Sequence, residues 1–172
     1  KMAKIYVADL MDYNEGKLEG IWIELYKGIT ESDMLAEITA FLRKRTEETG
    51  ELHEEWRLDD TDDLPLEGEV LLSDIESICS IPDWNWQALI GYANGIGGGM
   101  EYAVEHFAEA FQGYWDSELA FAENLLDEQC DLEKLIGNLA SYFDYEAYAK
   151  DLFIGDYMSV DTSEGVAVFL NV

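Results

Sequence analysis

The stretch IWIELYKGITESDMLAEITAFLRKRTEETG, residues 21–50, places a strand signal directly before a helix signal. IWIEL (21–25) has the alternating pattern of a strand with one buried face. Thr30 opens the run T-E-S-D, a variant of the capping box, and the apolar residues that follow keep helical spacing until Gly50. Because both signals occur within one short segment, the sequence predicts an α+β fold.

The residues on either side extend this unit. IYVADL (5–10) alternates like a strand, and the turn-rich stretch DYNEGKLEG (12–20) separates it from 21–25. This order predicts a hairpin or a split pair of strands. LHEEWRL (52–58) predicts one more strand, so we expect an N-terminal α+β unit that ends near residue 62.

The rest of the chain alternates between breaks and apolar segments. DDTDDLPLEGE (59–69) is its most acidic and least apolar stretch and predicts a linker. The glycines at 97–99 predict a break between helices. Helical spacing is expected at 70–80, at 84–95 and over a long segment that begins at 101, and a hairpin is expected at 157–172.

Charge is distributed unevenly along the chain, whose net charge is −28. Residues 1–57 hold 13 acidic residues and eight Lys or Arg, whereas residues 58–172 hold 25 acidic residues and only Lys134 and Lys150. Such a field repels nucleic acid and anionic membranes and attracts basic surfaces over long range. We therefore expect a basic protein partner and no binding to nucleic acid or to a membrane.

A row of glutamates gives this charge a regular arrangement. On a helix over 101–114, Glu101, Glu105 and Glu109 fall on one stripe, and apolar residues gather on the opposite side. A solvated helix face is the ordinary interpretation, but like charges four residues apart destabilise a helix by about 0.2–0.5 kcal/mol per pair. No Lys or Arg relieves this repulsion between Arg57 and Lys134, which favours a function for the charge itself.

Signals for catalysis or metal binding are weak. His53 and His106 are the only histidines, and neither lies in a metal-ligand or nucleophile motif. We expect His106 to be solvated or locally hydrogen-bonded, and we expect no enzymatic activity, no catalytic residue, no cofactor and no metal site. Cys79 and Cys130 lack a paired motif, which favours two ordinary buried thiols in a reduced, cytoplasmic protein.

Several segments resemble the ArdA family of antirestriction proteins. They include IYVADLMDYNEGKLEGIWIEL (5–25), HEEWRLDD (53–60), FAEAFQGYWDSELAFAENLLDE (107–128) and SYFDYEAYAKDLFIGDYMSV (141–160). The resemblance implies a DNA mimic that occupies the DNA-binding site of type I restriction–modification enzymes. It also implies an elongated, curved chain of three small domains, expected at 1–62, 63–99 and 100–172, with a homodimer contact in the last.

The resemblance and the charge pattern together give two sets of candidate residues. Carboxylates expected to mimic DNA phosphates are Glu101, Glu105, Glu109, Asp116, Glu118, Glu123, Asp127 and Glu128. Aromatic residues expected either in the dimer interface or in a small core are Tyr142, Phe143, Tyr145 and Tyr148. Two alternatives stay open: an acidic chaperone for basic DNA-binding proteins, and a halophilic adaptation that would require salt for folding.

Overall fold

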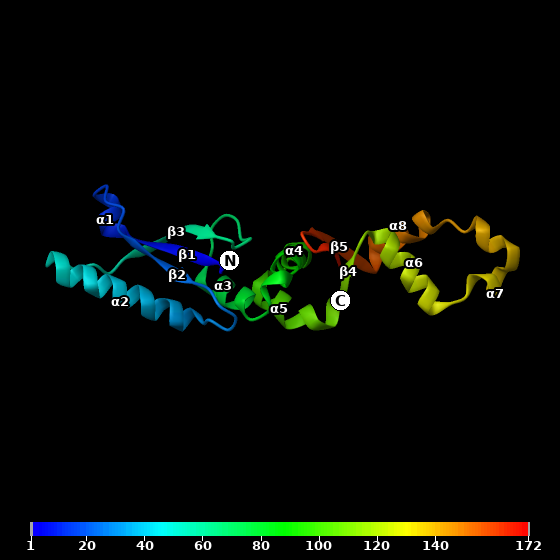
Figure 1. Cartoon of the computed structure of the whole chain (residues 1–172), viewed down its shortest axis with the longest axis horizontal. Coiled ribbons are helices and arrows are strands. Elements are labelled where there is room, and N and C mark those ends of the chain that lie inside the picture. The colour runs from blue at the N-terminus through cyan, green and yellow to red at the C-terminus, as the bar shows by residue number, and fades with distance from the viewer. Residues whose placement is uncertain (1, 172) are drawn as a thin grey trace. The chain divides into compact units, whose positions relative to one another are not determined.

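The computed structural model describes residues 2–171, and the chain divides into two compact units, Lys1–Trp86 (unit 1) and Gln87–Val172 (unit 2) (Figure 1). Each unit contains a three-stranded antiparallel sheet together with helices. The predicted α+β class is therefore confirmed. The division into three small domains stays a prediction.

Unit 1 is built on a sheet with the strand order β2-β1-β3. The predicted strands at 5–10 and 21–25 pair with each other, with Ile5 opposite Ile23. A short helix interrupts the connection between them. The elements are β1 (Lys4–Asp9), α1 (Leu10–Asn14), β2 (Gly20–Glu24), α2 (Glu31–Thr49), β3 (Trp56–Asp62), α3 (Leu72–Cys79) and the 3-10 turn η1 (Asp83–Asn85).

The predicted linker at 59–69 begins too early, because residues 59–62 belong to β3. Asp62 lies opposite Lys4, and Thr61 lies opposite Ile5. Charged side chains are common on the edge strand of a sheet, where they discourage pairing with other chains. The acidic composition therefore suggested a linker, while the backbone of the same residues completes the sheet.

Helix α2 has the two ends that the sequence predicts. Thr30 Oγ accepts from the amide of Asp33 at 3.1 Å, and the Asp33 carboxylate accepts from the amide of Thr30 at 3.0 Å. Gly50 ends the helix with φ of 77°, a conformation that other residues adopt at a cost. Glu76 of α3 adds an acceptor for the amide of Glu31 at 2.7 Å.

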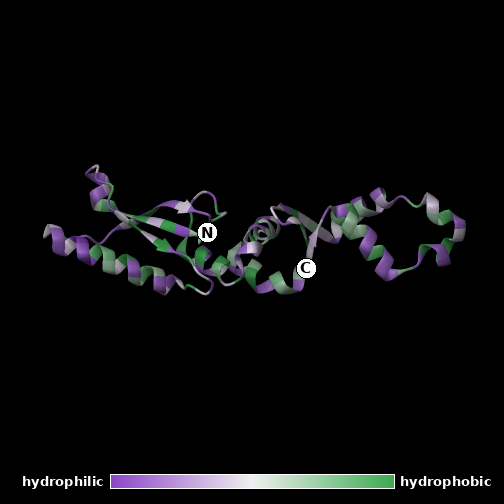
Figure 2. Cartoon of the chain, in the orientation of Figure 1, coloured by the Kyte–Doolittle hydropathy of each residue, from purple (hydrophilic) through white to green (hydrophobic). Residues whose placement is uncertain are grey.

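The core of unit 1 lies between the sheet and α2, with α3 beside them. Hydrophobic and hydrophilic residues alternate along α2 (Figure 2), as expected for a helix with one buried face. The fully buried side chains come from β1, β2, α2 and α3: Ile5, Val7, Ile23, Met34, Ile38, Ile75 and Ile78. Burying such side chains is the main stabilising term of a fold.

Unit 2 has a second sheet, with the strand order β4-β6-β5. The predicted hairpin at 157–172 is confirmed over 157–170 as β5 and β6, and residue 172 lies outside the described residues. The elements are α4 (Trp86–Ile96), α5 (Gly99–Ala110), β4 (Phe111–Trp115), α6 (Glu118–Gln129), α7 (Leu132–Ile136), the 3-10 helix η2 (Gly137–Tyr142), α8 (Tyr145–Gly155), β5 (Tyr157–Thr162) and β6 (Gly165–Leu170).

The predicted helix over 101–114 is correct only as far as Ala110. Residues 111–115 form β4, in which Phe111 lies opposite Phe169 and Trp115 opposite Val166 of β6. These pairing partners lie 58 and 51 positions further along the chain, so a local helical wheel does not detect them. The predicted break at 97–99 is confirmed, because Gly97 and Gly99 have φ of 72° and 81° between α4 and α5.

Aromatic rings fill the core of unit 2 around Phe169. Tyr92 of α4 stacks on Phe169 with ring centroids 4.5 Å apart, and Phe107 of α5 meets the same ring edge-on at 5.6 Å. Helix α4 also lies close to β5, because Gly91 and Gly95 leave room for Val160 and Met158. This packing fixes α5 with one face toward the sheet.

The two cysteines differ in exposure. Cys79 is fully buried in α3, as predicted, whereas Cys130 at the end of α6 is partly exposed, so the expectation of two buried thiols is wrong for Cys130. Both are free thiols. Among residues 2–171, none of the helices combines the length and the hydrophobicity that a bilayer crossing requires.

Candidate functional site

The eight predicted carboxylates are all exposed, and we refer to them together as the acidic surface. Three lie on α5, one lies in the turn between β4 and α6, and four lie on α6. In chain order they are Glu101, Glu105, Glu109, Asp116, Glu118, Glu123, Asp127 and Glu128. All belong to unit 2, and no Lys or Arg occurs in α5, β4 or α6.

The row on α5 points to solvent because the other side of the helix is buried. Ala103, Phe107 and Ala110 are the buried residues of α5. Glu101, Glu105 and Glu109 repeat every four residues, which separates them by about 6 Å along the axis. The core contacts of Phe107 therefore hold three carboxylates in a fixed row.

Helix α6 presents its acidic residues in the same way. Ser117 caps the helix by accepting from the amide of Ala120 at 3.0 Å, and Phe121 packs edge-on against Trp115 with centroids 5.3 Å apart. Glu118 accepts a hydrogen bond from the hydroxyl of Ser159 in β5 at 2.5 Å. This last contact holds one carboxylate of the acidic surface against the sheet.

Neutralising ion pairs are concentrated in unit 1. Unit 2 holds 16 acidic residues and two lysines, of which Lys134 lies 3.6 Å from Asp131. In unit 1, by contrast, Lys4, Lys17, Lys44, Arg45 and Arg57 all lie in ion pairs. The field of the acidic surface is therefore little reduced by cations within its own unit.

His106 lies on α5 among these glutamates. Its Nδ1 donates to the carbonyl oxygen of Tyr102 at 2.9 Å, since a carbonyl only accepts. The two rings also stack with centroids 3.9 Å apart. The expectation of a locally hydrogen-bonded imidazole is therefore confirmed.

The four candidate aromatic residues lie in two different environments. Phe143 contacts the rings of Tyr145 and Tyr148, with centroids at 4.9 and 5.8 Å. Partial burial raises the pKa of Tyr148, with Tyr157 and Cys130 adding to the effect. Tyr142, in contrast, is 84% exposed.

An apolar segment next to Tyr142 was missed by sequence reasoning. Leu135 and Leu139 are 67% and 64% exposed, and Ile136 between them is also exposed. We refer to Leu135, Ile136, Leu139 and Tyr142 as the apolar segment. Apolar spacing in the sequence suggests burial, and only the structure shows that α7 and η2 leave these side chains in solvent.

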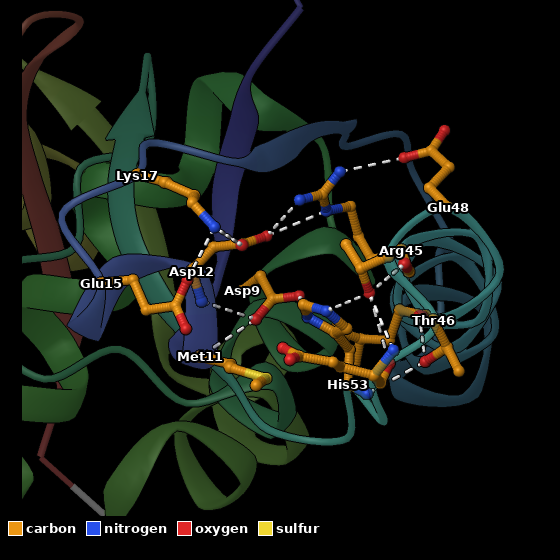
Figure 3. A network of polar contacts seen from close by, with 12 residues as sticks. Asp9, Met11, Asp12, Glu15, Lys17, Arg45, Thr46, Glu48 and His53 are labelled. Carbon is orange, nitrogen blue, oxygen red and sulfur yellow. Dashed lines mark hydrogen bonds and ion pairs between the residues drawn. The ribbon is translucent and has the colours of Figure 1, made fainter.

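A buried polar cluster lies in unit 1 (Figure 3), and it consists of Asp9, Asp12, Arg45 and His53. One ligand atom from each of Asp9, Asp12 and His53 lies within 4.8 Å of the others, a spacing that could hold a metal ion. Arg45, however, donates from Nε to Asp12 Oδ2 at 2.9 Å, and its Nη2 lies 2.8 Å from the same carboxylate oxygen. This contact raises the pKa of Arg45 and occupies the carboxylate with a cation.

Comparison with known protein families gives one clear match. The model of the ArdA family, described as antirestriction protein, matches residues 5–167. This range includes most of both sheets, the acidic surface, the apolar segment and the buried polar cluster. A comparison with curated proteins found no match.

Proposed function

Because the chain belongs to the ArdA family of antirestriction proteins, we propose that it inhibits type I restriction–modification enzymes by mimicking B-form DNA. In this proposal the protein occupies the DNA-binding site of the enzyme and thereby protects incoming mobile DNA. Inhibition requires no chemistry, so the protein acts without a catalytic residue, a cofactor or a metal.

The acidic surface is the observation that carries this proposal. Its eight carboxylates are exposed, seven of them on helices whose other faces are buried and Asp116 in the turn before α6, so they form a shaped array rather than a flexible acidic tail. Lys and Arg side chains that normally contact DNA phosphates supply the complementary charge on the enzyme. Attraction between the two surfaces speeds association and makes it sensitive to salt.

The net charge of the protein equals the phosphate charge of a short DNA duplex. Duplex DNA carries one charge per about 1.7 Å, so the net charge of −28 corresponds to roughly 48 Å, or about 14 base pairs. A homodimer doubles this to roughly 95 Å on the same basis. We propose such a homodimer, arranged as an elongated and curved assembly of small domains.

The apolar segment supports a dimer contact in the C-terminal region. Exposed apolar side chains on a soluble protein often belong to an interface. Tyr142 is the most exposed of the predicted interface residues, whereas the ring of Phe143 contacts those of Tyr145 and Tyr148. The substitution Leu139→Asp should give monomers in sedimentation analysis, and the same change at the exposed Leu18 of unit 1 serves as the control.

An acidic chaperone for basic DNA-binding proteins is the alternative function. Such proteins usually hold their charge in low-complexity tails, whereas here it lies within helices, which favours the mimic. Halophilic adaptation also favours acidic residues over lysine. It predicts loss of structure at low ionic strength, which circular dichroism would detect.

The decisive experiment is displacement of DNA. Purified protein is titrated into a type I restriction–modification enzyme already bound to labelled duplex DNA, at two salt concentrations. We expect displacement at a near-stoichiometric amount of protein and weaker competition at the higher salt concentration. No displacement, together with tight binding to a basic nucleoid protein, would favour the chaperone instead.

Charge variants then test whether the acidic surface is responsible. A single Glu105→Gln should have little effect, because one exposed carboxylate contributes little. One triple variant replaces Glu101, Glu105 and Glu109 by Gln, and the control variant replaces three exposed glutamates of unit 1 by Gln, namely Glu37, Glu47 and Glu51. The first variant should compete with DNA markedly less well than the control variant. Equal losses from the two triple variants would assign inhibition to total charge and not to this surface.

A further inference from the structure

The outer face of the sheet in unit 1 carries aromatic residues that the core does not use. Side chains alternate along a strand, so Ile5 and Ile23, which are both 0% exposed, face the core, and Tyr6 and Trp22 face away from it. Tyr6 lies directly opposite Trp22 in the pairing of β1 with β2, and their ring centroids are 5.1 Å apart. Trp22 is 43% exposed. A large aromatic ring therefore stands in solvent on an ordered strand.

Gly20 makes room for this aromatic pair. A β-carbon at this position would lie 2.6 Å from Cζ and Oη of Tyr6. The Tyr6 ring thus lies against the backbone of β2, in the space that a side chain would otherwise fill. Because the two rings are already in place, a ligand that binds to them loses little of its binding energy to the ordering of side chains.

Carboxylates border the two rings. Residues directly opposite each other share one face of a sheet. Glu24 of β2 and Asp62 of β3 both lie opposite Lys4. Asp60 of β3 lies opposite Tyr6, and Glu24 and Asp60 are exposed. With three carboxylates and one lysine, this face attracts cations. We refer to it as the aromatic face, which consists of Lys4, Tyr6, Trp22, Glu24, Asp60 and Asp62.

Lys4 shows how a cation lies on the aromatic face. Its Nζ is 4.7 Å from the centroid of the Trp22 ring and 3.6 Å from Asp62 Oδ2. The negative face of the ring and the carboxylate attract the ammonium together. Trp22 is 43% exposed with Lys4 in this position. The ring therefore keeps surface for a second cation.

Unit 1 combines an aromatic ring, a cation and a carboxylate a second time, with an arginine. The guanidinium carbon of Arg57 lies 4.3 Å from the centroid of the Tyr13 ring, and Arg57 also pairs with Asp59. A guanidinium suits such a place better than an ammonium, because it is planar, more weakly hydrated and able to stack on a ring while it donates to a carboxylate. An arginine is therefore the cation that best fits the exposed surface of Trp22.

We propose that the aromatic face binds an arginine side chain of a basic protein partner. The guanidinium stacks on Trp22 and pairs with Glu24, which lies two positions along the same strand and on the same face. Nucleic acid fits this face poorly, because its bases stack on exposed rings but the three carboxylates repel its phosphates.

This surface is separate from the one that carries the proposed function. The aromatic face belongs to unit 1, whereas the eight carboxylates of the acidic surface all belong to unit 2. The inference does not rest on the proposed function, since it is tested with peptides and without a restriction enzyme. Failure of either proposal leaves the other standing.

A peptide titration followed by NMR tests the proposal. Nitrogen-labelled full-length protein is titrated with a short peptide of alternating arginine and glycine, and with peptides in which lysine or uncharged citrulline replaces arginine. The chain has five tryptophans, so the indole N–H of Trp22 is followed beside four internal controls. We expect the arginine peptide to shift the Trp22 signal at a lower concentration than the lysine peptide, and the citrulline peptide to leave it unchanged. A Trp22 signal that does not move, or equal affinities for arginine and lysine, would overturn the proposal.

Variants at Lys4 separate the aromatic face from general charge attraction. Lys4→Met removes the cation that already lies over Trp22, so the arginine peptide should bind there about two- to fivefold more tightly. Lys44→Met makes the same change of charge on α2, where Lys44 pairs with Glu48, and should leave that affinity almost unchanged. Equal gains in the two variants would assign the effect to net charge and refute the proposal.

A variant of the ring itself completes the test. Trp22→Leu should abolish the preference for arginine over lysine, read from the amide signals of β1 and β2. Trp84→Leu, at a tryptophan of unit 1 that is 61% exposed, should keep this preference. A single-stranded oligonucleotide should not move the Trp22 signal. Movement caused by the oligonucleotide, or by raising the protein concentration without peptide, would mean that nucleic acid or a second copy occupies the face in place of an arginine.

Discussion

At the scale of single residues, Cys79 shows how burial changes chemistry. The side chain has 0% exposure, and burial raises the pKa of its thiol to about 11. Because the thiolate is the reactive form, about one molecule in a thousand is reactive at pH 8. We expect one thiol, Cys130, to react with a thiol reagent in the native protein, and Cys79 to react only after unfolding.

The variant Cys130→Ser provides the control for this experiment. The native form of this variant should not react with the thiol reagent on the time scale of the wild-type reaction. In denaturant its one remaining thiol, Cys79, should react. Rapid reaction of the native Cys130→Ser protein would mean that α3 opens readily and exposes Cys79.

The Thr30–Asp33 pair is a second feature at this scale. The hydroxyl and the backbone amide of Thr30 both lower the pKa of Asp33. The stabilisation is therefore present above the ordinary carboxyl pKa and is lost as the pH falls through the lower, folded value. Urea unfolding should show Asp33→Asn to be less stable than wild type at pH 7, with a smaller difference below about pH 4.

Thr30→Ala removes the other member of the same cap. Loss of an N-cap threonine should lower the free energy of unfolding by about 0.5–2 kcal/mol at neutral pH. Thr30→Ser keeps the hydroxyl and should restore most of this loss. If the Ala and Ser variants were equally stable, the cap hydrogen bonds would contribute nothing.

At the scale of elements, α4 and β5 pack through two glycines. A β-carbon at Gly91 would lie 2.2 Å from Val160, and one at Gly95 would lie 2.3 Å from Met158. In an exposed helix, Gly→Ala stabilises by about 1 kcal/mol. Here the clash should reverse the sign, and Gly91→Ala should lower the free energy of unfolding by about 1–3 kcal/mol.

A compensating variant tests this explanation. Val160→Ala makes room for the new methyl group. The double variant Gly91→Ala/Val160→Ala should therefore lose less unfolding free energy than the two single variants lose in total. Denaturant unfolding of the four proteins measures the coupling. Additive losses would show that Gly91 is needed for another reason.

At the scale of the whole molecule, the net charge of −28 implies repulsion between the many carboxylates. The chain carries 38 acidic residues and ten Lys or Arg, and unit 2 has only two lysines among 16 acidic residues. Salt screens such repulsion, with a Debye length of about 10 Å at 0.1 M. We expect the melting temperature to rise as NaCl is increased from about 0.02 M to about 0.3 M.

The matched control for this prediction is the triple Glu→Gln variant at 101, 105 and 109. It removes three charges from one helix and should therefore melt at a higher temperature than wild type in low salt, with a smaller difference in high salt. A melting temperature that does not change with salt would show that the repulsion is already balanced.

Local signals in the sequence were sufficient wherever a feature depends on neighbouring residues. Both ends of α2 were predicted because Thr30 and Gly50 act on the backbone within a few positions. The exposure of Glu101, Glu105 and Glu109 was predicted for the same reason, since helical periodicity alone separates them from Phe107.

Features that join distant segments were not predicted. The predicted helix over 101–114 was four residues too long. Residues Phe111–Trp115 form β4 instead, because they pair with β6. The buried polar cluster also escaped detection, since Asp9 and His53 lie 44 positions apart and nothing in their spacing indicates a contact. Such contacts depend on chain topology, which local pattern does not encode.

Composition and periodicity are local properties, and they were enough to predict the α+β class, the caps of α2 and the acidic charge of the helices in unit 2. The family resemblance came from the motif segments. The tertiary structure decided which strands pair, which side chains of α7 and η2 stay in solvent, and that Asp9 and His53 lie within hydrogen-bond distance of each other. The physical reason is that burial and hydrogen bonding between distant segments arise only when the chain is folded.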